Sequence, residues 1–232
     1  MQTIRRAKDR GHAEHGWLES WHTFAFADYF HPAHLGFSAL RVINEDFVQP
    51  GQGFGTHPHR DMEILTWVLE GALEHKDSMG SGSVIRPGEM QYMSAGTGVT
   101  HSEFNASKSE LVHLLQIWIL PKIAGAAPRY GQKNFATALA QGALVTLASP
   151  DGVGGSIAIR QDARVLAARA DEDREHAHAL APGRKAWIQV ARGGLLVNDL
   201  ALEVGDGLAV EGERELTLQV AKGGEFLLFD LP

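Results

Sequence analysis

Short apolar runs separated by glycine-rich turns recur along the chain, and this pattern restricts the fold more than any other feature of the sequence. The runs are rich in Val, Ile, Leu, Trp and Thr, as in "EILTWVL", "LLQIWI", "KAWIQV" and "FLLFDL". The turns between them include "PGQGFG", "SAGTG", "APGRK" and "AKGGE". Many short strands with regularly spaced turns are typical of β-sandwiches and β-barrels. The sequence therefore predicts an all-β protein.

A change in composition at "LASPDGVGGS", residues 147–156, indicates a long loop or linker. We therefore expect two domains, residues 1–145 and residues 146–232. The halves also resemble each other, since "HPHRDMEILTWVLEGAL" and "HAHALAPGRKAWIQVARGGL" both run from His-x-His through a Trp-bearing strand to a glycine turn. This indicates an internal repeat of one small β-barrel. Chance similarity between turn-rich segments is the alternative.

Helical periodicity is weak throughout the chain. The best candidates are "KNFATALAQGA", around Phe135 to Leu139, and "DARVLAARADEDREHAH", residues 162–178. We expect a helix at the first segment, and the second is a weaker candidate.

The composition excludes several classes of protein. There are no cysteines, so disulfides and thiolate metal ligands are absent. The formal net charge is −7 and no Lys/Arg cluster appears, which argues against direct nucleic-acid binding but leaves a protein partner open. The longest apolar run, "LVHLLQIWIL", is too short to span a membrane, and the first residues lack the apolar core of a secretory signal. We expect a cytoplasmic protein.

Two histidine-bearing pairs, in "GFGTHPHRDMEI" and "GTGVTHSEFN", predict a metal site. Residues i and i+2 of a strand point to the same face, so His57 shares a face with His59, and His101 with Glu103. Two such strands facing one barrel interior would bring all four groups to one ion. Imidazole and carboxylate ligands suit a first-row transition metal. Pro58 suits an edge strand or a bulge.

The same segments resemble the two sequence motifs of cupins. The first motif, a glycine before H-x-H and then a glutamate, is carried by Gly53, His57, His59 and Glu63. The second, Gly-x-x-His-x-x-x-Asn, is carried by Gly98, His101 and Asn105. The longer strings "HPHRDMEILTWVLEGALEHKDS", "GTGVTHSEFN" and "LQIWILP" resemble the pirin family, and most of all its bacterial quercetin 2,3-dioxygenase members. The similarity runs from "GWLESWHTFAFADYF" to "LQIWILP", about half the chain, and is weak beyond it.

This resemblance implies two tandem cupin barrels, of the double-stranded β-helix or jelly-roll type, packed face to face. The N-terminal one would hold a single divalent transition metal, iron(II) in the family's usual description, through His57, His59, His101 and Glu103. Residues 146–232 would form a degenerate cupin domain. Cupins in general often use the glutamate of the first motif as a ligand, so Glu63 is the alternative carboxylate, with a structural role favoured for it.

The activity implied by the resemblance is cleavage of a flavonol such as quercetin by O₂, with release of carbon monoxide. Glu103 would take the proton of the flavonol 3-hydroxyl, either as a ligand, a base or both. A metal nearby would lower the pKa of both groups. The alternative is a pirin without enzymatic activity, which uses its metal as a redox sensor and binds a protein partner. The motifs are the same for both functions.

The remaining histidines have simpler explanations. His176 and His178 form another His-x-His, but the corresponding late strand "EGERELTLQV" has no histidine, which favours a solvated face over a second metal site. For His22 we expect packing rather than a place in the pocket, and for His113 a core position. We expect the others to lie on the surface or in loops: His12, His15, His31, His34 and His75.

Overall fold

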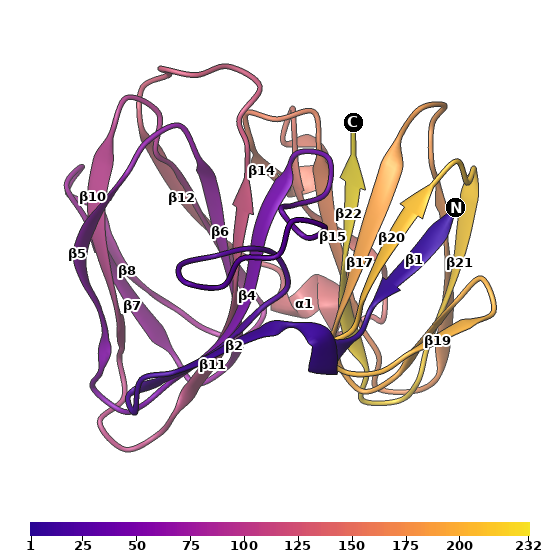
Figure 1. Cartoon of the computed structure of the whole chain (residues 1–232), viewed down its shortest axis with the longest axis horizontal. Helices are drawn as coiled ribbons and strands as arrows, with labels where there is room; N and C mark the ends of the chain where they lie inside the picture. Colours follow the sequence, from indigo (N-terminus) through magenta and orange to yellow (C-terminus); the bar gives the residue numbers. More distant parts are fainter.

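The computed structural model describes residues 1–232 and is almost entirely β-structure. Two barrels lie side by side, each built from a sheet of seven strands and a sheet of four (Figure 1). The two seven-stranded sheets face each other at the centre of the molecule, and the two four-stranded sheets form its outer layers. The prediction of an all-β chain with two tandem barrels packed face to face is confirmed.

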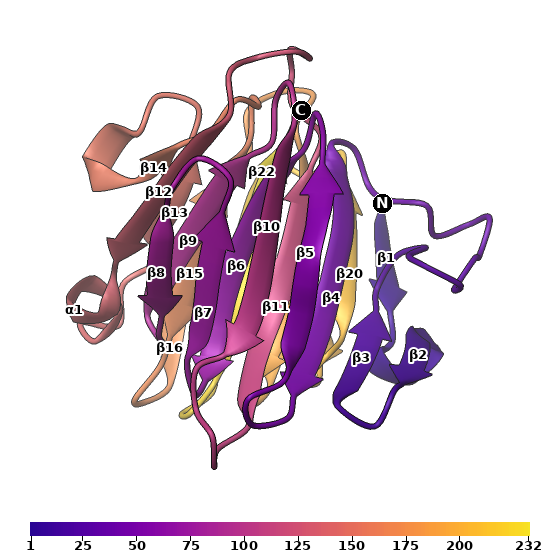
Figure 2. The same ribbon diagram turned by 90° about the vertical axis from the view of Figure 1, so that its left-hand side faces the viewer.

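The first barrel contains the strands that carry the histidine pairs. Its large sheet has the order β12 (Arg129–Asn134), β9 (Glu89–Ser94), β6 (Glu63–Glu70), β11 (Val112–Ile119), β4 (Leu40–Val48), β3 (Leu18–His22) and β2 (Gly11–Glu14). Its small sheet has the order β5 (Gly53–His59), β10 (Val99–Asn105), β7 (Leu73–Asp77) and β8 (Gly82–Ile85). Figure 2 shows this small sheet in front of the large one.

The second barrel repeats the arrangement. Its large sheet has the order β1 (Gln2–Arg5), β20 (Gly207–Glu211), β17 (Lys185–Arg192), β22 (Glu225–Leu231), β15 (Arg164–Arg169), β13 (Val145–Ser149) and β14 (Ile157–Ala158). Its small sheet has the order β16 (Arg174–Ala179), β21 (Glu215–Val220), β18 (Leu195–Val197) and β19 (Leu200–Leu202). The 3-10 helices are η1 (Ala7–Asp9) and η2 (Val153–Gly155).

The first strand of the chain belongs to the second barrel by its pairing. β1 is antiparallel to β20, with Gln2 opposite Val210 and Arg5 opposite Gly207. The N-terminus therefore lies beside the late strands in Figure 1. The chain enters the first barrel only after η1. The division into domains of residues 1–145 and 146–232 therefore stays a prediction.

The largest core cluster lies between the barrels. It contains 26 buried residues, among them Leu65 and Trp67 of β6 and Leu227 and Phe229 of β22. Side chains alternate along a strand, and the other face of β22, with Phe226 and Leu228, points into the second barrel instead. The interior of that barrel is filled by a cluster of 17 buried apolar residues.

Helical structure is limited to one short α-helix. α1 (Ala136–Leu139) lies within the first segment predicted to be helical. The second candidate, residues 162–178, was wrong, because β15 and β16 occupy it. Buried alternate residues such as Val165 and Ala167 face the core between the barrels, whereas Leu166 and Ala168 face the barrel interior. A strand buried on both faces carries apolar residues continuously, so its sequence does not alternate.

No helix in the structure has the length and apolar character to span a membrane.

Candidate metal centre

The two histidine pairs lie on adjacent antiparallel strands of the small sheet. His101 of β10 is directly opposite His57 of β5. β5 is an edge strand, with no neighbouring strand on one side. It can therefore accommodate Pro58, which has no N–H group to donate to a neighbouring strand. The register then shifts, so that Glu103 is opposite Phe54 and β5 holds one more residue than β10 between the two pairs. This β-bulge turns both Phe54 and His57 toward the cavity of the barrel.

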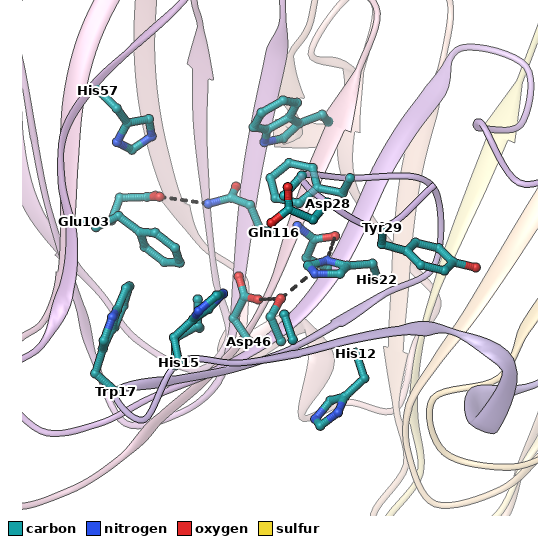
Figure 3. Close-up of a pocket in the computed structure, with 18 of the residues that line it drawn as sticks. His12, His15, Trp17, His22, Asp28, Tyr29, Asp46, His57, Glu103 and Gln116 are labelled. Atoms are coloured by element: carbon teal, nitrogen blue, oxygen red, sulfur yellow. Dashed lines mark hydrogen bonds between the residues drawn. The ribbon is translucent and has the colours of Figure 1, made fainter. Parts of the chain in front are cut away.

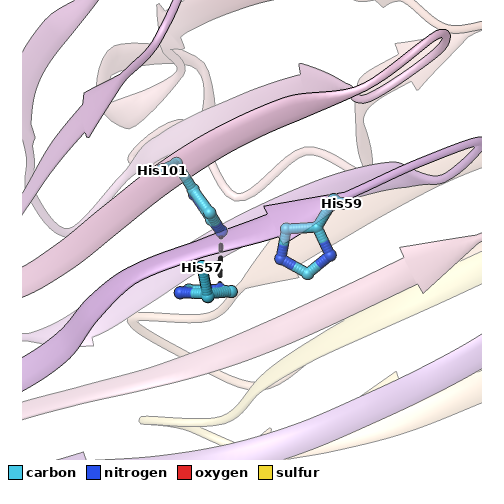
Figure 4. A group of neighbouring side chains, drawn as sticks. All are labelled: His57, His59 and His101. Atoms are coloured by element: carbon cyan, nitrogen blue, oxygen red, sulfur yellow. Dashed lines mark hydrogen bonds between the residues drawn. The ribbon is translucent and has the colours of Figure 1, made fainter.

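Three imidazole rings meet at one point on the cavity wall (Figure 4). Their centroids are 4.4 Å apart for His57 and His101, 4.8 Å for His59 and His101, and 4.9 Å for His57 and His59. The Nε2 atoms of His57 and His101 are 2.9 Å apart. One ring nitrogen of each histidine lies within 4.8 Å of the other two, which is close enough for all three to bind one ion.

The protonation of these rings suits metal binding. Burial and the neighbouring His57 lower the pKa of His59 to about 4. Burial, together with the three other nearby histidines, lowers the pKa of His101 to about 2. His57 Nδ1 is 2.8 Å from the carbonyl oxygen of Gly55, to which Nδ1–H donates, so Nε2 keeps its lone pair. Imidazole nitrogens that converge in this way fit a divalent transition metal.

Glu103 is buried next to these rings. Gln116 Nε2–H donates to Oε2 over 2.9 Å, and the Thr66 hydroxyl lies 3.5 Å from Oε1. Burial raises the pKa of Glu103 to about 7, and Asp46 adds to the rise. A carboxylate oxygen of Glu103 groups within 4.8 Å with nitrogens of His75 and His101. The structure thus brings three predicted ligands together and places the fourth beside His101.

The metal centre opens into a cavity of about 840 Å³. Figure 3 shows His57 and Glu103 at one side of it, and Asp46 and His22 nearer the middle of the view. The aromatic residues of its wall are Trp17, Phe26, Tyr29, Phe54 and Trp118. Polar groups also line it, among them Ser20, Asn44, Asp46 and Gln116. A concave site with mostly apolar walls and a few convergent polar groups is typical of small-molecule binding.

Three of the other histidines lie in or at this cavity. His22 is buried and lines the wall, with Nδ1 2.9 Å from Oδ1 of Asn44, so the expectation of simple packing was wrong. His12 and His15 are exposed, as expected, but they also border the cavity. β2 and β3 form the edge of the large sheet and carry these residues to the cavity, which the local sequence does not reveal.

His75 was expected on the surface but is completely buried behind His101. The sequence did contain a signal, since His75 and Asp77 form a third pair of side chains spaced by two residues. His113 is half-buried and bonded to Glu45, near the core position predicted for it.

Glu63 lies on the opposite face of its strand from the metal centre. It shares that face with Leu65 and Trp67 of the core between the barrels. Its Oε2 accepts hydrogen bonds from the Tyr92 hydroxyl at 2.5 Å and from the Arg160 backbone N–H at 2.7 Å. This position supports the structural role expected for Glu63.

The His-x-His of the second barrel does not belong to any group of three metal-binding side chains. His178 Nε2 is 3.1 Å from Asp230, and His176 Nε2 has no hydrogen-bond partner. No group of three metal-binding side chains forms after Glu103 in the sequence. The preference for a solvated face over a second metal site stays a prediction.

Comparison with known proteins gives consistent matches along the whole chain. Residues 3–119 match the family model described as Pirin, and residues 146–231 match the one described as quercetinase C-terminal cupin domain. The chain is 50% identical over 232 residues to the quercetin 2,3-dioxygenase of Escherichia coli strain K12, covering 100% of this chain and 99% of that protein.

Two crystal structures show the same fold. YhhW from Escherichia coli superposes with a TM-score of 0.96 at 48% identity, covering 100% of this chain and 98% of that one. The bacterial pirin YhhW in complex with nickel(II) superposes with a TM-score of 0.93 at 48% identity, covering 100% and 99%. The second structure contains a divalent transition metal in a close relative.

Proposed function

This chain belongs to the pirin family, and we propose that it is a metal-dependent dioxygenase that cleaves flavonols such as quercetin with O₂ and releases carbon monoxide. The observation that carries this proposal is the meeting of three imidazoles at the wall of an aromatic cavity of about 840 Å³. The full-length identity of 50% to a quercetin 2,3-dioxygenase gives the reaction and the substrate class.

We propose His57, His59, His101 and Glu103 as the residues that hold the metal, with iron(II) as the native ion. The nickel(II) complex of the relative from Escherichia coli supports a divalent ion without identifying which one is native. A divalent ion would supply Lewis acidity, which lowers the pKa of a hydroxyl group bound to it.

The cavity walls would bind and orient the flat rings of the substrate. Trp118 is packed edge-on against His59, with ring centroids 4.9 Å apart, so an aromatic wall adjoins the metal ligands. Trp17 and Phe54 make a second edge-on pair at 5.2 Å on the same cavity. Aromatic walls stack on aromatic substrates and exclude water from the site. Water exclusion protects an electron-rich flavonol anion until it reacts with O₂.

Glu103 is the proposed acceptor for the proton of the flavonol 3-hydroxyl. Glu103 lines the cavity beside His101, where a carboxylate can act as a general base toward a bound hydroxyl group. Gln116 and Thr66 fix its two oxygens, so the group that accepts the proton keeps one orientation. The sequence alone left open whether this residue is ligand, base or both, and the proposal assigns it both roles.

Turnover of quercetin by metal-loaded protein tests the proposed function. Purified protein loaded anaerobically with iron(II) and then exposed to O₂ should consume quercetin, seen as loss of its near-ultraviolet absorbance, and release one carbon monoxide per flavonol. Stoichiometric metal binding with no consumption of quercetin would instead favour the metal-dependent sensor that binds a protein partner.

Replacing Glu103 by Gln separates proton transfer from folding. The amide keeps the size of the side chain but has no basic oxygen, so we expect kcat to fall by roughly 10²–10⁴-fold. Metal content measured by elemental analysis should stay above half of the wild-type value, because three imidazoles remain. Unchanged turnover in this variant would remove Glu103 as the base.

The same reasoning assigns the two halves of the chain different roles. We propose residues 1–145 as the metal-binding pirin domain and residues 146–232 as a degenerate cupin domain. The apolar side chains that fill the second barrel support this, because 17 buried residues pack together there, whereas the first barrel holds the cavity of about 840 Å³ beside the histidines.

A further inference from the structure

His101 uses both of its ring nitrogens. Its Nε2 points toward His57 at the metal centre, and its Nδ1 is 3.4 Å from Nδ1 of His75 on the neighbouring strand β7. The far nitrogen of that second ring, His75 Nε2, is 3.1 Å from Oδ2 of Asp77. Three side chains therefore form a continuous line from the metal centre to a buried carboxylate.

On the side of His101 that faces His75, the carboxylate of Asp77 determines where the protons lie. A carboxylate only accepts hydrogen bonds, so the proton of His75 must be on Nε2, where it is donated to Asp77. His75 Nδ1 then carries a lone pair and accepts from Nδ1–H of His101. His101 Nε2 is consequently left unprotonated, which is the state in which it can bind a cation.

The surroundings hold this arrangement in place. The side chains of His75 and Asp77 are both 0% exposed. The His75 ring stacks on Tyr130, with centroids 4.9 Å apart and planes 23° apart. Asp77 Oδ1 accepts the backbone N–H groups of Met79 at 2.9 Å and Ser81 at 3.0 Å, so its Oδ2 stays directed at His75.

We propose that His75 and Asp77 are positioning residues that fix the tautomer and orientation of the metal ligand His101. This inference rests on the metal centre of the proposed function and adds two residues outside the proposed ligand set. Hydrogen-bonded partners behind a histidine ligand commonly contribute 10–100-fold to metal affinity.

The variant Asp77→Asn tests the tautomer with little change of shape. The asparagine oxygen can still accept from Met79 and Ser81, while its NH₂ group faces His75 Nε2. That nitrogen then has to accept, the proton of His75 moves to Nδ1, and two N–H groups oppose each other at His101. We expect nickel(II) affinity, measured by calorimetric titration of the metal-free protein, to fall by about 10–100-fold.

A second readout does not depend on metal or on activity. In the metal-free wild-type protein, ¹⁵N chemical shifts of the ring nitrogens should identify His75 as protonated at Nε2. In Asp77→Asn, the His75 proton should be on Nδ1. The opposite tautomer of His75 in the wild-type protein would overturn the proposal.

Asp230→Asn is the matched control, because Asp230 is buried and lies at the same 3.1 Å from Nε2 of His178 in the second barrel. It alters another buried histidine–aspartate pair, and also the ion pair of Asp230 with Arg184, but no metal ligand lies behind them, so nickel(II) affinity should not change. His75→Phe is a second test, since it keeps a ring against Tyr130 but offers no acceptor to His101. We expect it to weaken nickel(II) binding at least as much as Asp77→Asn.

The outcomes separate this proposal from the metal centre itself. If wild-type protein binds no nickel(II) in a 1:1 ratio, the metal centre is wrong. If wild-type protein binds nickel(II) and both variants bind it equally well, only the positioning role is wrong. Binding of two nickel(II) ions, one of them lost in His75→Phe, would show that His75, His101 and Glu103 hold a second ion and would also overturn the proposal.

Discussion

Gly53 shows at the scale of one residue why a glycine precedes the metal ligands. A Cβ atom there would lie 2.2 Å from the carbonyl oxygen of Glu103 and 2.5 Å from the Cα of Phe104. Any side chain would push β5 away from β10. The glycine of the first motif therefore allows the close strand contact that brings His57 opposite His101.

The variant His57→Ala should lose the metal while keeping the fold. His57 is only half-buried on an edge strand, so its removal leaves no large cavity and should change the free energy of unfolding by less than about 1 kcal/mol. Elemental analysis should find metal content well below the wild-type ratio after dialysis. A variant with unchanged metal content would contradict the assignment of this ligand.

Asp46 should make the metal-free protein less stable as the pH rises. Burial raises its pKa from 3.8 to about 7, and the hydrogen bond from Ser20 only partly opposes this. The unfavourable ionised form is absent below pH 3.8, where the side chain is protonated in both states, and its full effect is present above about pH 7.

Asp46→Asn should therefore stabilise the protein relative to wild type, by an amount that increases by roughly 2–4 kcal/mol between pH 4 and pH 8. Urea unfolding of both metal-free proteins at the two pH values measures this difference. A pH-independent difference would mean that the carboxyl group is ionised in the fold without penalty.

At the scale of elements, one face of β6 lies toward the candidate metal centre and the other toward the contact between the two barrels. Thr66 faces the first barrel and lies near Glu103, whereas Glu63 and Trp67 face the second barrel. A single strand thus supports the metal centre on one side and the contact between barrels on the other.

Glu63→Ala should separate the two faces. The Tyr92 hydroxyl and the Arg160 N–H would lose their acceptor in a buried position, which should lower the free energy of unfolding by roughly 2–4 kcal/mol. The metal-to-protein ratio should stay at the wild-type value, because this carboxylate points away from the three histidines. Loss of metal in the folded variant would instead support the ligand role that cupins often give to this glutamate.

Much of the site was predictable from single elements. The spacing of His57, His59 and His101 within short strands correctly indicated that these side chains meet. His22 and His75 were missed, because strand periodicity gives only the relative face of neighbouring residues. Which face is inside depends on strands far away in the sequence, so one buried histidine looks like an exposed one.

At the scale of the whole molecule, the core between the barrels joins them into one unit. Trp187 of β17 is 4% exposed and packs on Phe24 and Phe37 of the first barrel, with ring centroids 4.8 Å and 5.7 Å apart. Trp67 of the first barrel donates to Glu225 of the second over 2.7 Å. Other polar contacts also cross between the sequence halves, such as those of Arg192 with Glu70 and with the carbonyl oxygen of Leu69.

Trp187→Ala should destabilise both barrels together. Removing a buried tryptophan typically costs about 3–5 kcal/mol, and the cavity would open where the two large sheets meet. Circular dichroism and the release of bound metal should follow one thermal transition, at a lower temperature than in wild type. Metal release that kept the wild-type midpoint while circular dichroism changed earlier would show that the barrels unfold independently.

The sequence by itself determined the all-β class, the repeat of two barrels and the three histidines that meet at the candidate metal centre. These features depend on local properties, namely turn chemistry, strand periodicity and the donor atoms of each side chain. Only the tertiary structure decided that β1 joins the second barrel, that Glu63 faces away from the metal and that His75 stands behind His101. The reason is that each of these depends on the pairing of strands distant in sequence, and pairing is selected by burial of the whole molecule rather than by any one segment.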